Sequence, residues 1–309
     1  MLRAVPARPG LAALLAGAAV AFAAPAAAEP SAAETTRAVA APPPAAPPLA
    51  ARAEDLAPES PAALLERAFA NLYGDDFVQV LTLSTRRRGS RPLVRRVQLT
   101  RKQSVRPGKA LVRFLEPGDV RRTGVLILER DDRYDDFFVF LPALGKIRRV
   151  VSGQRADAFF GTDLSYEDLE PKHAGDWAVR ALGAAEEAGV ACRRLDIRPR
   201  PHHESTYERM ESCIDPVRGV ILRTGFFRRG EEVKALRVDP ASVREVGGRQ
   251  IPFVFRMETP SRRGETEVRT ESYEIRTGIS DAVFTTTNLE AGDADGDRRA
   301  AAPPTTAAP

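Results

Sequence analysis

The first regular pattern in the chain is helical and runs from Pro61 to Tyr73. Its apolar residues recur three and four positions apart, so they share one face of a helix that must cover something. Ser60 is placed to cap the first turn, Pro61 suits the first helical position and Gly74 follows the end. The apolar positions are Leu64, Leu65, Ala68, Phe69 and Leu72.

From Asp76 onward the period changes to two, which predicts a long series of strands. The turns between them are short and favour antiparallel hairpins over crossovers through helices. One short helix is predicted over Gln154–Phe160. The predicted strands are Phe77–Arg86, Leu93–Lys102, Lys109–Leu115, Gly124–Arg130, Phe137–Leu141, Lys146–Val151, Trp177–Leu182, Gly189–Arg198, Tyr207–Ile214, Val220–Arg228, Glu232–Val238, Gln250–Thr259 and Glu265–Arg276.

So many strands exceed what one flat, open sheet holds, and the sheet is therefore expected to curl on itself. Two strands are apolar on both faces, at Val78–Leu83 and Val125–Leu128. A helix on the concave side of a curled sheet would explain this second apolar face. The predicted fold class is mainly β with a few helices.

The two ends of the chain differ in composition from the part between them. Residues 1–28 have the layout of a cleavable secretory signal, with Arg3 and Arg8 before an apolar run and small residues before Glu29. Residues 29–60 are rich in Ala and Pro and predict a disordered tether, and residues 291–309 predict a disordered tail. Residues 61–290 remain for one large β domain, exported to the periplasm of a Gram-negative envelope.

The overall charge of the chain argues against a nucleic-acid-binding protein and distinguishes few other classes of function. The chain has 46 basic and 42 acidic residues, a formal net charge of +4 and a pI near 9.3. Because the two signs are interleaved along the strands, no basic face for nucleic acid is predicted. A mild attraction to anionic lipid head groups is compatible with this excess.

Cys192 and Cys213 are the only cysteines of the chain. An even pair in an exported chain permits one disulfide, and the two residues fall on neighbouring predicted strands. Facing residues of such strands come close enough for a bridge only in one register. A disulfide is favoured over two buried thiols.

The most distinctive stretch is Phe137–Pro171. An apolar strand ends in Leu141-Pro142, a basic strand follows, and then come Phe159-Phe160-Gly161 and the acidic run Asp163–Asp168. This order, "apolar strand, Leu-Pro, Lys-x-Arg-Arg, Phe-x-Gly-[ST]-Asp-x-Ser-Tyr-Glu-Asp", resembles the outer-membrane lipoprotein-sorting-like proteins, relatives of the periplasmic carrier LolA and its receptor LolB. The resemblance extends over Pro61–Leu289 and includes the closing stretch Asp281–Leu289.

The resemblance implies an incomplete, half-open antiparallel β-barrel wrapped around or covered by helices, with a hydrophobic hollow for acyl chains. It implies a carrier that moves a lipid or lipoprotein between the inner and outer membrane, with transient membrane contact. It also implies a partner, an inner-membrane permease of the resistance-nodulation-division type. A long Ala/Pro segment and a tail are departures from the compact carriers, and they make a free lipid the better-favoured cargo.

Several residues are candidates for ligand contact. Arg148 and Arg149 would pair with the head group at the cavity rim, while Phe159, Phe160 and Tyr166 would line its mouth. The alternative for the aromatic residues is core packing, and for the arginines a salt bridge on one face of the strand. The acidic residues Asp163, Glu167, Asp168 and Glu170 are interpreted as a surface turn whose carboxylates pair with those two arginines.

No enzymatic, metal or cofactor motif is found. The stretch His202-His203-Glu204 is interpreted as an exposed loop, since adjacent residues of an extended segment point to opposite faces. Two other functions remain open. One is a periplasmic docking subunit of a permease or envelope complex without lipid cargo. The other is a hydrolase that uses Ser165, Asp163 and a histidine.

Overall fold

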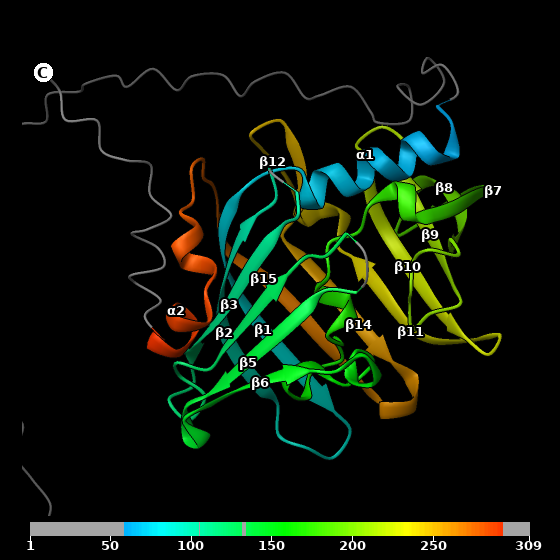
Figure 1. Ribbon diagram of the computed structural model, residues 1–309. Coiled ribbons are helices and arrows are strands. Elements are labelled where there is room, and N and C mark those ends of the chain that lie inside the picture. Colours follow the sequence, from blue (N-terminus) through cyan, green and yellow to red (C-terminus); the bar gives the residue numbers. More distant parts are fainter. Residues whose placement is uncertain (1–58, 105, 132–133, 293–309) are drawn as a thin grey trace, which may run out of the picture. The chain divides into compact units, whose positions relative to one another are not determined.

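The computed structural model describes residues 59–104, 106–131 and 134–292 (Figure 1). The predicted signal peptide, nearly all of the predicted tether and most of the predicted tail lie outside these residues. The domain boundaries derived from the sequence therefore stay predictions.

Helix α1 (Pro61–Tyr73) forms as its sequence predicts. The Ala63 N–H donates to the Ser60 hydroxyl at 3.1 Å, and the Gly74 N–H ends the helix on the Ala70 carbonyl. Its apolar face is buried and lies across one end of the curved sheet (Figure 1).

One large antiparallel sheet is the main element of the described part of the chain, and its strands curl around a common interior (Figure 1). Its strands are β1 (Phe77–Arg87), β2 (Leu93–Lys102), β3 (Lys109–Glu116), β4 (Gly124–Leu128), β5 (Asp136–Leu141), β6 (Lys146–Val150), β7 (Trp177–Glu187), β8 (Val190–Pro199), β9 (Arg209–Asp215), β10 (Val220–Arg228), β11 (Glu231–Val238), β14 (Val254–Thr259) and β15 (Gly264–Ile275).

The strand order is β6-β5-β4-β3-β2-β1-β15-β14-β11-β10-β9-β8-β7. The two edge strands, β6 and β7, are consecutive in the chain but do not pair with each other. The barrel is thus half open, which confirms the predicted fold class. Residues 151–176, here called the connecting segment, lead from one edge to the other through the short 3-10 turns η3 (Ser152–Gln154), η4 (Phe159–Gly161), η5 (Glu167–Leu169) and η6 (Ala174–Asp176).

Two predictions of secondary structure are wrong. The helix expected over Gln154–Phe160 is absent, because η3 ends at Gln154 and η4 begins only at Phe159. The strand expected over Gln250–Thr259 is divided at Phe253, where the chain leaves β13 (Arg249–Pro252) and enters β14. β13 forms a separate hairpin with β12 (Val243–Val246), which the sequence analysis missed. Its turn is Gly247-Gly248, both with positive φ, a pair typical of a tight hairpin.

The second apolar face of β1 and β4 has a different explanation from the one expected. The turn η9 (Asp281–Phe284) and helix α2 (Thr286–Ala291) pack against the convex face of β3 to β6 (Figure 1). We call residues 279–291 the C-terminal segment. Its apolar side chains form one buried cluster with the sheet, which consists of Val78, Leu111, Leu126, Phe140, Ile279, Val283, Phe284 and Leu289.

The structure joins Cys192 of β8 to Cys213 of β9 in a disulfide, with 5.5 Å between the Cα atoms. The two strands are direct neighbours in the sheet. Both cysteines are buried in a small apolar cluster with Val220, Leu222 and Val238.

Candidate functional site

The concave side of the sheet encloses a cavity of about 250 Å³. Its walls are mostly aliphatic and aromatic side chains that point inward from alternate positions of the strands. They include Phe77, Leu81, Leu83, Val97, Leu99, Val112, Ile127, Phe226, Leu236, Phe255, Met257 and Val268. The predicted hydrophobic hollow is therefore present.

Two other parts of the chain complete the walls. Phe69 and Leu72 come from the buried face of α1, and Phe159, Leu164 and Leu169 come from the connecting segment. The cavity consequently lies between the sheet, one helix and the loop that spans the sheet's open side.

The three predicted aromatic residues have different positions. Phe159 lines the cavity, with its ring 5.9 Å from Phe114 and 5.7 Å from Tyr166. Phe160 has φ +45°, a strained conformation for a bulky residue, and its ring packs 4.6 Å from Phe114. Tyr166 packs edge-on against Phe137. Neither Phe160 nor Tyr166 belongs to the cavity wall itself.

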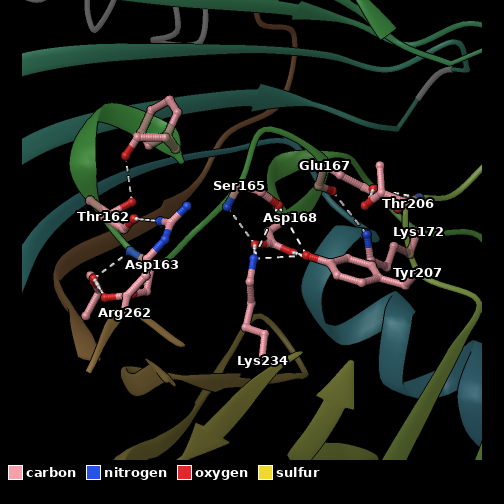
Figure 2. A network of polar contacts seen from close by, with 12 residues as sticks. Thr162, Asp163, Ser165, Glu167, Asp168, Lys172, Thr206, Tyr207, Lys234 and Arg262 are labelled. Carbon is pink, nitrogen blue, oxygen red and sulfur yellow. Dashed lines mark hydrogen bonds and ion pairs between the residues drawn. The ribbon is translucent and has the colours of Figure 1, made fainter. Parts of the chain in front are cut away.

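The acidic run is not a surface turn, and that prediction is wrong. Asp168 accepts hydrogen bonds from Lys234 Nζ at 2.6 Å and from Tyr207 OH at 3.1 Å (Figure 2). The Ser165 N–H donates to the same carboxylate at 2.7 Å. Lys234 Nζ also lies 2.9 Å from Tyr207 OH. Burial raises the pKa of Tyr207, and the nearby Asp168 carboxylate adds to the shift.

The other carboxylates of this stretch, Glu167, Glu170 and Asp163, also have hydrogen-bond partners. Glu167 accepts from the Thr206 N–H at 2.9 Å (Figure 2), and Glu170 receives Arg155 Nε at 2.8 Å. Asp163 accepts from the Thr266 hydroxyl at 2.9 Å. These contacts tie the connecting segment to β11, to β15 and to the loop before β9.

Arg148 and Arg149 do not pair with the acidic run either. Both are exposed on the edge strand β6 and lie outside the cavity wall. Arg149 forms an ion pair with Asp136 of the adjacent strand. Burial alone would raise the pKa of Asp136, but hydrogen bonds from Arg130 and Arg149 lower it. The sequence analysis placed the partners wrongly because a strand residue's neighbours come from the adjacent strand.

Two cations that the sequence analysis missed do line the cavity, Arg101 of β2 and Lys172 of the connecting segment. Arg101 is 4% exposed and its side chain lies next to Tyr73 of α1, and burial lowers its pKa. A signal was present in the sequence. Arg101 follows Val97 and Leu99 at the alternate positions that point inward.

A compact group of titratable residues lies beside Arg101. Glu129 accepts from the Gly108 N–H, from Gln103 Nε2 at 3.1 Å and from Arg106 at 3.3 Å, and it contacts His173. Burial opposes these contacts, yet they lower the pKa of Glu129 to about 2. Asp135 has few such partners, and burial together with Glu170 raises its pKa to about 7.

The structure also places the histidines considered as metal ligands and the residues considered for a hydrolase. His202 is exposed, and its Nε2 lies 3.6 Å from Asp176. His203 packs on the Trp177 ring at 4.7 Å, with its Nδ1 4.0 Å from the same carboxylate. Within the described residues, no group of three or more His, Cys, Asp or Glu side chains is arranged to hold a metal ion. The buried Ser165 hydroxyl faces Tyr207 and Lys234, whereas Asp163 faces Thr266, so the arrangement expected of a hydrolase is not formed.

A family model described as "uncharacterized protein" matches residues 107–291, more than half of the chain. None of the curated proteins matches this sequence. None of the helices in the described part of the chain is long and apolar enough to cross a membrane.

The solved structures that share this fold include the following three. A DUF1329 family protein from Desulfovibrio piger has 23% sequence identity, with a TM-score of 0.69 over 74% of this chain and 97% of that one. A putative outer membrane lipoprotein-sorting protein domain from Vibrio parahaemolyticus has 22% identity and a TM-score of 0.66, covering 73% and 97%. A LolA superfamily protein from Nitrosomonas europaea has 17% identity and a TM-score of 0.61, covering 74% and 99%. At the level of the fold, the resemblance seen in the sequence is confirmed.

Proposed function

The chain belongs to the family of uncharacterized proteins whose model spans residues 107–291, and we propose that it is a periplasmic carrier that binds the acyl chain of a lipid or lipoprotein. The observation that supports this most is the apolar cavity between the concave sheet, α1 and the connecting segment. The LolA superfamily protein and the lipoprotein-sorting domain with the same fold agree with it.

The size and the lining of the cavity suit a hydrocarbon chain. The space is enough for on the order of ten water-sized groups or more. Each methylene moved from water to an apolar wall contributes about 0.8 kcal/mol, so one chain gives substantial affinity without a covalent bond. In this proposal the cargo is held by burial of its acyl chain and forms no covalent bond with the protein.

Transport needs a donor and an acceptor. In this proposal the carrier receives its cargo at the inner membrane from a permease of the resistance-nodulation-division type and delivers it to the outer membrane. Arg148 and Arg149, exposed beside the connecting segment, are proposed to meet anionic head groups during this transient membrane contact. Phe160 and Tyr166 support the wall through Phe159.

The test is whether the exported protein carries lipid. The full chain is expressed with its own predicted leader. The exported protein is then purified from the periplasm and analysed by native mass spectrometry and lipid extraction. We expect bound lipid in the unmodified protein and much less in Leu99→Trp, which fills the cavity. Val94→Trp is the control, because Val94 lies on the same strand and is exposed.

Absence of lipid from the unmodified protein would contradict the carrier and favour a docking subunit without cargo. Equal lipid content in the two tryptophan variants would show that any bound lipid lies elsewhere.

A further inference from the structure

The buried and half-buried cations of the barrel differ in whether they have a carboxylate partner. Lys234 pairs with Asp168 at 2.6 Å, and Arg155 forms two hydrogen bonds to Glu170. Arg101 and Lys172, which line the cavity, form no ion pair within 4.0 Å among the described residues. The cavity therefore has two cations on a wall that is otherwise mostly apolar.

Arg101 has unused hydrogen-bonding capacity. One of its terminal nitrogens donates to the Leu169 carbonyl at 3.0 Å, and its guanidinium carbon lies 5.4 Å from the centre of the Tyr73 ring. Its Nε is buried and has no acceptor in the part of the chain that the structure describes. A guanidinium stays charged and carries five N–H donors, so a buried one with free donors is costly unless a ligand supplies oxygen atoms.

Lys172 adds a second donor on the same cavity wall. Among the residues that the structure describes, its ammonium group donates one hydrogen bond, to the Glu167 carbonyl at 3.3 Å. Burial opposes its charge, but Tyr73 and the carboxylates of Glu167 and Glu170 hold its pKa above the usual value. Those two carboxylates are already bound, by Thr206 and Arg155 respectively. The ammonium group keeps donors free for an acceptor.

Building on the proposed carrier function, we infer that the cargo is an amphiphile whose anionic head group, a carboxylate or a phosphate, enters the cavity and binds Arg101 and Lys172. Its acyl chain lies along the apolar wall formed by Val97, Leu99 and their neighbours. A carboxylate or phosphate matches the planar fork of an arginine with two parallel hydrogen bonds, which gives selectivity for the head group.

The same strand provides a matched control. Arg95 lies on the same face of β2 as Arg101, four positions before Leu99, and its guanidinium carbon is 5.8 Å from the centre of the Phe114 ring. Arg95 also has buried nitrogens without an acceptor among the described residues, but it does not line the cavity. Arg101→Met removes a buried charge from β2, and Arg95→Met removes a half-buried charge from the same strand.

The experiment measures competition for the cavity in the full chain after lipid removal. The uncharged fluorescent probe N-phenyl-1-naphthylamine is displaced by dodecanoate, dodecyl phosphate, dodecanol or dodecylamine, which share one chain length and differ in the head group. In the unmodified protein we expect at least one of the two anions to compete at concentrations about tenfold lower than dodecanol, and dodecylamine to be the weakest.

The variants assign that preference to residues. Arg101→Met should bring the best anion to the level of dodecanol while dodecanol itself competes as before, and Lys172→Met should reduce the preference in part. Arg95→Met should leave it unchanged. A merely structural role for Arg101 would weaken all competitors alike. The head-group series in the unmodified protein gives its result even where a variant fails to fold.

Each contrary result has a distinct meaning. If dodecanol competes as well as both anions, the head-group inference is overturned and the carrier proposal stands. If acetate or inorganic phosphate alone displaces the probe as well as dodecanoate does, the site serves free anions and the inference is likewise wrong. If neither the probe nor any amphiphile binds, the carrier proposal itself fails.

Discussion

Two segments without much regular structure cover the curved sheet, one on each face, and they are held by different forces. The C-terminal segment covers the convex face through apolar side chains such as Phe284 and Leu289, which are buried against β3 to β6. The connecting segment spans the open, concave side. Besides apolar residues such as Phe159, it is held to the rest of the barrel by buried ion pairs and hydrogen bonds, chiefly those of Asp163, Glu167 and Asp168.

This difference explains how one protein can be both well packed and hollow. An apolar cover gains free energy only by filling space, so it leaves no room beneath it. Polar anchors fix the position of a segment without filling the space beneath it. The connecting segment can therefore close the barrel with Phe159 and Leu169 at the wall of a cavity that stays open to a ligand.

The largest expected effect comes from removing a polar anchor. Lys234→Met leaves the Asp168 carboxylate, with 4% of its side chain exposed, without its cation. We expect the free energy of unfolding in urea to fall by about 3–5 kcal/mol. Arg256→Met is the control, because its ion pair with Glu267 is exposed and its loss should cost less than about 1 kcal/mol. Similar losses in both variants would contradict the anchoring role.

The next effect compares the apolar contacts of the two covers. Leu289→Ala removes a fully buried side chain from the filled convex face and should cost about 3 kcal/mol. Leu169→Ala, at the cavity wall, should cost about 1 kcal/mol, because that side chain is only half-buried. Thermal and urea unfolding of both variants measure the difference. A loss at Leu169 as large as that at Leu289 would show that the interior is filled.

Added volume should give the same order of tolerance with a smaller difference. Leu111→Trp on the convex face overfills a packed cluster and should destabilise the fold by about 2 kcal/mol. Leu99→Trp, on the cavity side of the neighbouring strand, should cost under about 1 kcal/mol because space is available. Unfolding curves of the two variants decide this. The result also shows whether the lipid-blocking variant is folded.

The smallest effect depends on pH. The folded protein holds a proton on Asp135 up to a pKa of about 7, whereas the unfolded chain releases it near the ordinary value. Between these two values stability must fall as pH rises, because the folded state binds the extra proton. Asp135→Asn should therefore stabilise the protein by about 1–2 kcal/mol more at pH 8 than at pH 5.

The comparison with the unmodified protein is needed because His203 acts in the opposite direction. Burial lowers its pKa, so its contribution to stability is lost as pH falls. This contribution is common to both proteins and cancels in the difference. An equal effect of Asp135→Asn at both pH values would show that Asp135 has an ordinary pKa.

The local pattern of residues predicted helix α1 and most strands, but it also predicted a helix over Gln154–Phe160 that is absent and missed α2. The spacing of apolar residues in Pro61–Tyr73 and the cap at Ser60 define a helix in any surroundings, since they act within one or two turns. Alternation and turn residues defined the strands equally well, except near Gly247-Gly248 and Phe253, where a second hairpin interrupts the sheet. The order of motifs also indicated the half-open barrel, although through resemblance.

Partners far apart in the chain were beyond the reach of the sequence pattern. The acidic run looked like a solvated turn because nothing near it reveals that Lys234, Tyr207 and Thr206 converge on it. The strand pattern likewise does not say whether an inward side chain meets another one or empty space. Packing and pairing depend on the path of the whole chain, and so the tertiary structure alone separates the filled face from the hollow one and places Arg101 and Lys172 in its wall.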